Sequence, residues 1–91
     1  MEFEWDPKKA DENLRKHGVD FREAALAFYD KNAVILHDEA NSLDEIRFQL
    51  IGISPNRLLF VAYTEKSDRV RIISARKANA RHIRIYNEYN G

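Results

Sequence analysis

The segment from Val70 to Tyr86, VRIISARKANARHIRIY, gathers side chains suited to binding a polyanion. Cations alternate there with apolar and aromatic residues, and no acidic residue interrupts them. Basic side chains with aromatic and apolar groups between them are typical of surfaces that contact nucleic-acid phosphates. We therefore expect a polyanionic ligand, RNA first among them. The five cations of the segment are Arg71, Arg76, Lys77, Arg81 and Arg84.

The charge of the chain is balanced overall but unevenly distributed. The 91 residues include 15 Lys or Arg and 15 Asp or Glu. Residues 1–65 hold 8 basic and 13 acidic residues, whereas residues 66–84 hold 7 basic residues and one acid. Such asymmetry points to a binding partner for the basic segment. The simpler interpretation is a solvated face of the last helix.

Arg47 alternates with Ile46 and Phe48 in a strand-like pattern, so its side chain projects from the opposite face of the predicted sheet. It is either part of a site on the open face or a solvent-facing arginine paired with Asp44 or Glu45. Arg71 and Arg76 cannot both be buried without a partner, because that would cost several kcal/mol. We therefore expect these two arginines to meet acids, a partner or phosphate.

Two residues could take part in RNA chemistry, one by transferring protons and the other by stacking on a nucleobase. His17 ends the first predicted helix, where a cation is favourable near the negative end of the helix dipole. An imidazole is also the side chain best suited to proton transfer near neutral pH. Tyr63 is either a core tyrosine or a platform on which a base stacks.

A metal site is not predicted, and no cofactor is expected. The three histidines are far apart, the chain lacks cysteine, and its three glycines form no phosphate-binding loop. RNA carries its own nucleophile in the 2′-hydroxyl, so cations and one proton-transfer group could cleave it without a metal.

The composition predicts a single globular domain in a reducing cytoplasm. Hydrophobic residues make up 44% and charged residues 33% of the chain. The absence of cysteine excludes disulfides and suits the cytoplasm. The acidic start, MEFEWD, does not look like a signal peptide, and no apolar run is long enough for a membrane helix.

Local signals predict the order β-α-α-β-β-β-β-α. Residues 2–5 form an edge strand, Asp6-Pro7 begins a helix that ends at Gly18, and Asp20 with Glu23 has the spacing of a capping box. Strands are predicted at 33–37, 46–53, 57–64 and 70–75, the third of them central. A helix follows from residue 79.

These elements indicate an α+β fold with a mainly antiparallel sheet and helices on one face. Ile83, Tyr86 and Ala80 are expected on one side of the last helix. Arg71 and Arg76 lie on opposite faces of a straight strand, but a bulge or strand end near Ser74 would place them on the same face.

The chain resembles the BrnT family of type II toxin–antitoxin ribonucleases, whose fold is similar to that of RelE-like toxins. The resemblance extends over nearly the whole sequence, in FEWDPKKADENLRKHGVDFREA, DEIR and VAYTEKSDRVRIISARKA. It implies a metal-independent endoribonuclease that stops translation. It also implies a cognate BrnA-type antitoxin, in a heterotetramer or larger complex that binds operator DNA through the antitoxin.

The resemblance also implies roles for individual residues. Arg47 and Arg76 would bind the scissile phosphate and stabilise its transition state, with His17 or Tyr63 as the proton-transfer group. The residues expected to contact the rest of the RNA are Lys16, Arg71, Lys77 and Arg81. The alternatives are a nucleic-acid-binding module without catalysis and a dock for an acidic segment of another protein, the antitoxin included.

Overall fold

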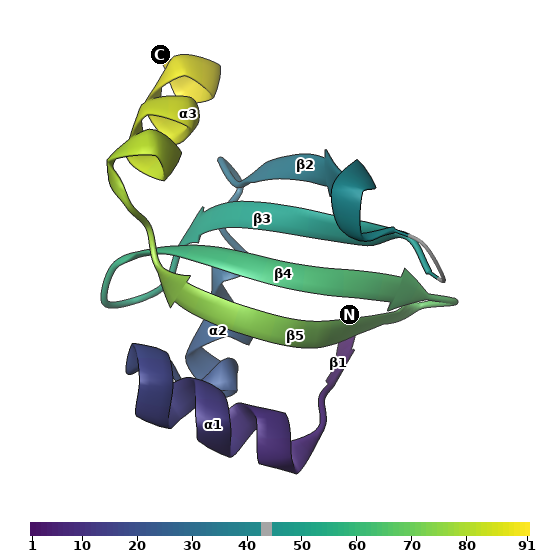
Figure 1. Ribbon diagram of the computed structural model, residues 1–91. Coiled ribbons are helices and arrows are strands. Elements are labelled where there is room, and N and C mark those ends of the chain that lie inside the picture. The colour runs from purple at the N-terminus through teal and green to yellow at the C-terminus, as the bar shows by residue number, and fades with distance from the viewer. Residues whose placement is uncertain (43–44) are drawn as a thin grey trace.

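The computed structural model describes residues 1–42 and 45–91, which form a five-stranded sheet flanked by helices (Figure 1). The elements follow the predicted order, with a short 3₁₀ helix added after the second strand. The predicted polar connection, residues 38–45, includes positions 43 and 44, which lie outside the described residues. The elements are β1 Glu2–Glu4, α1 Pro7–His17, α2 Phe21–Ala27, β2 Val34–Asp38, the 3₁₀ helix Glu39–Asn41, β3 Arg47–Ile53, β4 Leu58–Lys66, β5 Arg69–Lys77 and α3 Ala80–Asn90.

Local sequence signals set the ends of the first two helices. The Asp6 carboxylate accepts a hydrogen bond from the backbone N–H of Lys8 at 2.9 Å, which confirms the predicted N-cap of α1. Gly18 ends α1 in the left-handed conformation, with φ of 68°, a region open to glycine without steric cost. Asp20 caps α2 in the same way, by accepting from the backbone N–H of Arg22 at 2.8 Å.

The capping box predicted for α2 forms only in part, because Glu23 binds distant residues instead. Its carboxylate accepts a hydrogen bond from the Ser54 hydroxyl at 2.7 Å and pairs with Arg57 at 2.9 Å. The hydrogen bond from Arg57 is the main reason that the pKa of Glu23 lies below its usual value. Glu23 thus ties α2 to the turn between β3 and β4, a contact between elements that local spacing cannot indicate.

The strands lie in the order β1-β5-β4-β3-β2. Consecutive strands from β2 to β5 pair antiparallel, which confirms the predicted meander. β1 lies at an edge, as predicted, and pairs parallel to β5, with Glu2 opposite Arg69 and Glu4 opposite Arg71. The first and last strands of the chain are therefore neighbours.

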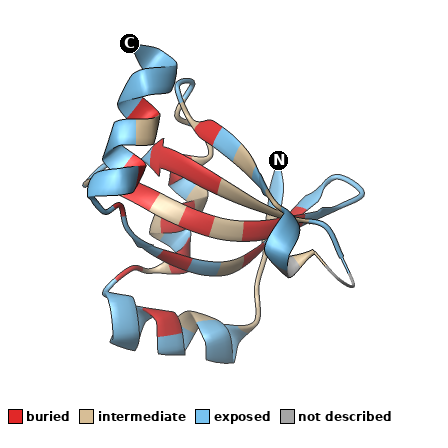
Figure 2. Ribbon diagram, turned by 45° about the horizontal axis from the view of Figure 1, so that its top comes forward, coloured by how far each residue is buried: buried red, intermediate tan, exposed pale blue. Residues whose placement is uncertain are grey.

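Helices α1 and α2 cover one face of the sheet and enclose the main core. Figure 2 shows buried positions along the central strands, while most of α1 is exposed. Trp5, just after β1, packs edge-on against Phe21 of α2, with ring centroids 6.0 Å apart. The buried core residues are Val19, Phe21, Ala24, Ala27, Leu50, Leu59, Val61, Tyr63, Val70, Ile72 and Ala75.

Helix α3 lies on the opposite face of the sheet, which corrects the expectation that all helices pack on one face (Figure 1). Alternate residues of β3 and β4, including Ile51 and Phe60, are apolar on that face too and need a second cover. The helix buries His82 and Tyr86, whereas Ile83, predicted on the same side as Tyr86, is 45% exposed. The fold is thus an α+β sheet with two helices on one face and one on the other.

A polar contact fixes α3 to the rest of the molecule. The Tyr86 hydroxyl donates a hydrogen bond to Asp30 at 2.7 Å, and the same carboxylate oxygen accepts from the backbone N–H of Ile53 at 2.9 Å. Burial and this bond raise the pKa of Tyr86 to about 12. Asp30 therefore joins the end of α2, the end of β3 and α3.

Candidate nucleic-acid interface

A bulge interrupts the pairing of β4 with β5. Ile72 lies opposite Tyr63, but the next pair along the ladder is Ser74 with Ala62. Ile73 is thus the extra residue on β5, close to the position where the sequence allowed a bulge. After the bulge, each side chain of β5 points to the face opposite the one it would occupy in a straight strand.

The bulge places Arg71 and Arg76 on the same face, the one that α3 partly covers. Arg76 lies opposite Phe60, which packs in the cluster beneath α3. Arg71 lies opposite Thr64, and Thr64 lies opposite Arg47 on β3, so these residues form one row across three strands. The backbones of Arg47 and Arg71 are two strand spacings apart, roughly 10 Å. All three arginines therefore project from one face.

The row between the arginine-bearing rows consists mainly of small side chains. Gln49 lies opposite Ala62, and Ala62 lies opposite Ser74. On one side of it lies the row of Arg47, Thr64 and Arg71, and on the other side the row of Phe60 and Arg76. Phe60 and Thr64 are four residues apart on β4, which places these two rows roughly 13 Å apart. Because Ala62 and Ser74 are short, an extended ligand could cross the sheet between the rows and meet arginines on both sides.

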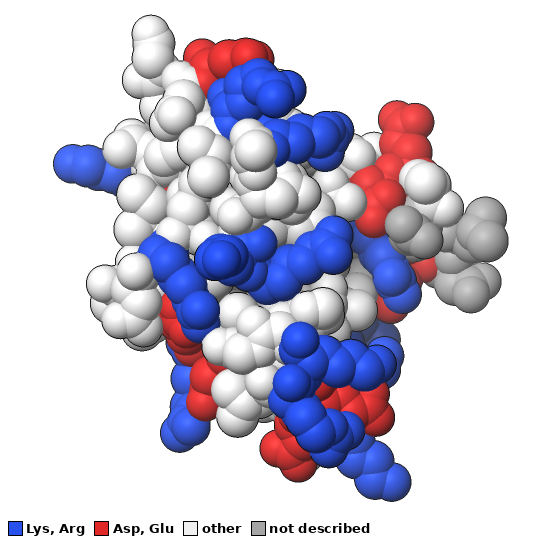
Figure 3. All heavy atoms as spheres, turned by 60° about the vertical axis from the view of Figure 1, so that its left-hand side comes forward, with Lys and Arg blue, Asp and Glu red and all other residues white. Residues whose placement is uncertain are grey.

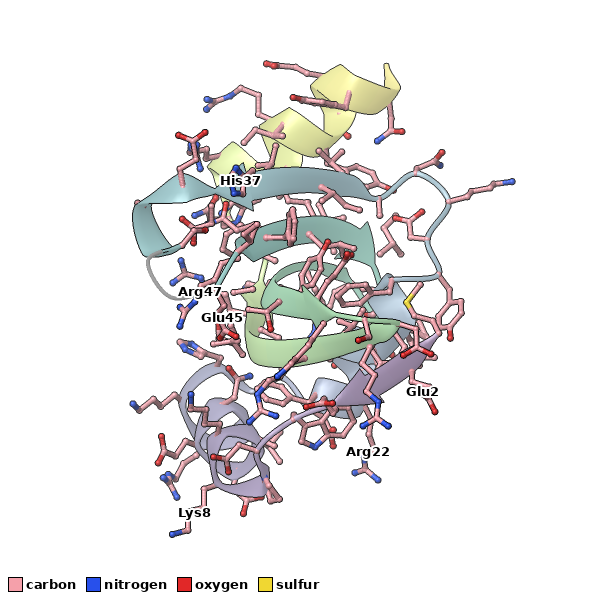
Figure 4. The ribbon with its side chains drawn as sticks, turned by 90° about the vertical axis from the view of Figure 1, so that its right-hand side faces the viewer. Glu2, Lys8, Arg22, His37, Glu45 and Arg47 are labelled. Atoms are coloured by element: carbon pink, nitrogen blue, oxygen red, sulfur yellow. The ribbon has the colours of Figure 1, made fainter. Side chains whose placement is uncertain are left out.

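Arg47 begins β3 and is half-buried. Its backbone N–H donates to the Ser42 hydroxyl at 3.0 Å, and Asp38 lies opposite it in register. Figure 4 shows Arg47 beside Glu45, at the end of the sheet where β3 begins. Arg47 forms no ion pair with a residue in 1–42 or 45–91, while the predicted partner Asp44 lies outside these ranges.

Arg71 is neutralised by the neighbouring edge strand. Its guanidinium donates to the Glu4 carboxylate at 2.8 Å, and Arg69 lies 3.5 Å from the same carboxylate. The hydrogen bond from Arg71 is the main reason that the pKa of Glu4 lies below its usual value. Exposed pairs of this kind add little stability. Their effect here is to compensate the charge of Arg71.

Arg76 rests on an aromatic support instead of an acid. Its guanidinium carbon lies 5.6 Å from the centre of the Phe60 ring, within the range of a cation–π contact. The His82 ring stacks on Phe60, with centroids 3.9 Å apart and an angle of 5° between the planes. The side chain of Arg76 forms no ion pair among the described residues.

His82 belongs to this support and was not predicted as a site residue. It is 3% exposed, and its Nδ1 accepts a hydrogen bond from the backbone N–H of Asn79 at 3.2 Å. Burial, followed by the charges of Arg76 and Arg81, lowers the pKa of His82 below its ordinary value. The spacing of Asn79 and His82, that of a capping box, was the available signal, although histidine is an unusual partner there.

Lys16 and His17 lie where the end of α1 approaches the bulge of β5. Both side chains are exposed and line a shallow hollow together with Ile73 and Ser74. Arg81 is exposed in the first turn of α3, close enough to influence His82. Lys16 and His17 therefore lie beside the outer edge of β5, where Asn13 of α1 pairs with Ala75, and Arg81 lies at the start of α3.

Tyr63 does not join this surface. It is 1% exposed and packs in the main core between Phe28 and Phe48, with ring centroids 4.8 and 5.6 Å away. Burial is the main cause that raises the pKa of Tyr63 to about 12. Of the two interpretations open from the sequence, the structure supports the core tyrosine.

Lys77 also departs from the predicted group. It lies opposite Leu59, a residue of the main core, so it belongs to the face opposite that of Arg76. Adjacent residues of a strand alternate in this way, and the bulge lies too early in β5 to change their relation. Lys77 is exposed but does not point to the same side as the three arginines.

The space-filling view supports a basic surface at the level of the sheet. Figure 3 shows a band of Lys and Arg side chains at mid-height, between α3 above and α1 below. A further group lies low on the same side and has acidic side chains among it. Basic side chains therefore form a band along the sheet on this side of the molecule, although the chain as a whole has no net charge.

Residues 1–42 and 45–91 contain no group of three or more His, Asp or Glu side chains placed to hold a metal ion. No helix within them has both the length and the apolar character that crossing a bilayer demands.

Comparison with protein families assigns the class of the protein. A family model matches residues 5–82, a span that includes every element from α1 to β5 and the start of α3. It describes toxins of type II toxin–antitoxin systems. The chain belongs to this family, the "Ribonuclease toxin, BrnT, of type II toxin-antitoxin system". A search of curated proteins found no significant match. The resemblance to BrnT is thus confirmed, while the likeness to the RelE-like fold stays a prediction.

Proposed function

We propose that this BrnT-family toxin is a metal-independent endoribonuclease and that its site is the arginine-bearing face of the sheet. The observation that carries the proposal is the placement of Arg47, Arg71 and Arg76 on one face, with only Arg71 paired to an acid among the described residues. Guanidinium groups suit this task because they remain charged and bind phosphate oxygens in a bidentate manner.

In the proposed reaction, the 2′-oxygen of a ribose bonds to the adjacent phosphorus while the bond from phosphorus to the 5′-oxygen breaks. One proton leaves the 2′-hydroxyl and one is delivered to the 5′-oxygen, so the products are a 2′,3′-cyclic phosphate and a 5′-hydroxyl. Arg47 and Arg76 stabilise the charge on the five-coordinate phosphorus from either side of the small-residue row. His17, at the outer edge of β5 beside the bulge, transfers protons.

Residues next to Arg47, Arg76 and His17 hold the flanking RNA. Lys16 lies beside His17, and Arg71 lies in the same cross-strand row as Arg47. Arg81 and Arg76 both lie close enough to His82 to affect its pKa. Tyr63 and Lys77 have no part in the proposal, because one is a core residue and the other belongs to the opposite face.

The test is to incubate the purified protein with RNA in excess EDTA and to analyse the ends of the products. We expect scission that leaves 2′,3′-cyclic phosphates. Arg76→Ala should slow this scission by about 100- to 1000-fold while RNA binding persists. Arg22→Ala is the matched control, since Arg22 is 82% exposed on α2 and pairs with Asp20. Binding of RNA without scission by the wild type would replace the proposal with a nucleic-acid-binding module.

We also propose that the toxin acts in the cytoplasm, stops translation by cutting messenger RNA, and is neutralised by a BrnA-type antitoxin. The type II family implies an antitoxin partner, and the basic face offers a surface that such a partner could block. The expected complex is a heterotetramer or larger that binds operator DNA through the antitoxin. Co-expression followed by light scattering and an operator mobility-shift assay tests it, and a one-to-one complex without DNA binding would contradict it.

A further inference from the structure

The side chain of Asn13 completes the outer edge of β5. β1 pairs with β5 only from Arg69 to Arg71, so Ala75 lies beyond the end of that ladder. The Asn13 Oδ1 accepts a hydrogen bond from the Ala75 backbone N–H at 3.0 Å, and Nδ2 donates to the Ala75 carbonyl at 2.8 Å. One side-chain amide thus makes both hydrogen bonds that a residue of a neighbouring strand would make.

The same amide holds the end of α1. Its Nδ2 also donates to the Val19 carbonyl at 2.9 Å, just after Gly18 has ended the helix. Asn13 is 6% exposed and is the buried residue of a helix whose other positions are exposed or half-buried. Both amide hydrogens and the oxygen are in use, and loss of the side chain would leave buried backbone groups unpaired.

Residues of the proposed site lie directly beside both anchored segments. Lys16 and His17 follow Asn13 by three and four residues, so the three side chains share a face of α1. Together with Ser74 they border one hollow. Arg76 follows Ala75 directly, and both lie after the bulge. The bulge determines which face of the sheet Arg76 occupies. Asn13 therefore connects the proton-transfer residue to the phosphate-binding strand.

We propose that Asn13 is a positioning residue for RNA cleavage, which sets the end of α1 against the C-terminal half of β5. The inference rests on the proposed function. Asn13 touches no substrate in this role. It acts through Ala75, which keeps the bulge in register, and through the helix face that carries His17. Misplacement of a reacting group by about 1 Å can cost two orders of magnitude in rate.

The experiment compares Asn13→Ala and Asn13→Ser with Val34→Ala, using single-turnover cleavage of a short RNA, thermal melting and amide hydrogen exchange. Val34 is buried on β2 in the cluster beneath α3, away from α1 and β5, so Val34→Ala reports the effect of a core loss that leaves Asn13 and Ala75 unchanged. Asn13→Ser keeps a polar atom but cannot span both backbone groups of Ala75. We expect both Asn13 variants to lower the cleavage rate about 100-fold with KM little changed. The amide of Ala75 should lose its protection from exchange.

The outcomes separate this inference from the proposed function. Cleavage by the Asn13 variants at the rate of an equally destabilised Val34→Ala protein would overturn the positioning role. If the wild type does not cut RNA, the proposed function fails, and RNA affinity then decides the role of Asn13. A loss of affinity in the Asn13 variants but not in Val34→Ala supports positioning of the basic residues, and equal affinities overturn it.

Discussion

The two halves of β5 each carry an arginine, but the two arginines have different partners. In the first half, the strand is paired with β1, and Arg71 donates to Glu4 at 2.8 Å. In the second half, the outer edge is completed by the neutral amide of Asn13, and Arg76 lies over Phe60. One arginine is compensated by an acid, whereas the other is supported by uncharged groups.

The difference separates a structural arginine from one available to a ligand. A compensated guanidinium must give up its carboxylate before it binds phosphate, while Arg76 can keep its aromatic contact and bind with its open edge. A charge that protein groups do not neutralise is the pattern expected where a ligand supplies the opposite charge. The C-terminal half of β5 is therefore the centre of the proposed site, and the N-terminal half its flank.

The largest expected effect is on cleavage. Arg76→Ala should lower the single-turnover rate by about 100- to 1000-fold, the usual loss when one donor to a transition-state charge is removed. Arg71→Ala should cost less than about tenfold, since Arg71 is partly compensated. Quantified gel assays of both variants measure the contrast. Equal losses would show that the two halves of β5 contribute alike.

Salt dependence tests the same contrast through binding. Plots of log affinity against log salt for an uncleavable RNA, one that lacks the reactive 2′-hydroxyl, should become shallower by about one unit in Arg76→Ala. Arg71→Ala should change the slope by less, because its charge is shared with Glu4. Fluorescence anisotropy over a series of salt concentrations measures the slopes. A larger change for Arg71 would reverse the assignment of centre and flank.

Removing the Glu4 carboxylate should make Arg71 as available to RNA as Arg76. Glu4→Gln keeps the shape of the side chain but releases Arg71, so RNA affinity should rise by about threefold at low salt. The double variant Glu4→Gln with Arg71→Ala is the control and should lose the gain. An unchanged affinity in the single variant would mean that Arg71 lies outside the RNA path.

The smallest expected effect is on stability against pH and concerns the support of Arg76. The pKa of His82 in the folded protein is below its ordinary value of 6.5. The neutral ring therefore contributes stability above pH 6.5, and this contribution is lost as the pH falls towards the lower folded pKa. The melting temperature of the wild type should fall more between pH 7.5 and 5.5 than that of His82→Gln. Equal slopes would contradict a neutral His82.

Features encoded by neighbouring residues could be predicted from the sequence. Asp6, Gly18 and Asp20 mark helix ends because caps depend on the local backbone, and the alternation in residues 46–53 marks a strand whose one face is buried. Short turns between strands indicated antiparallel pairing, as observed. The family could also be recognised, because its motifs are runs of adjacent residues.

Features that depend on contacts between distant residues could not be predicted. Whether Arg71 and Arg76 share a face depends on the single extra residue Ile73, and alternation alone cannot show a bulge. The inner side of α3 is set by the ring of Phe60, on which His82 stacks, so Ile83 turns outward. Asn13 gave no signal at all, since a polar residue on a mostly exposed helix looks ordinary until the strand beside it is known.

The pairing of the first strand with the last one also affects how this protein is made. Glu4 and Arg71 are 67 residues apart in the chain, and Asn13 and Ala75 are 62 apart. Such distant contacts form late in folding, because closing a long loop loses chain entropy before other contacts compensate for that loss. A nascent chain on the ribosome cannot assemble the basic surface until nearly all of it has been synthesised. For the site proposed above, cleavage would therefore begin only after almost the entire chain has been synthesised.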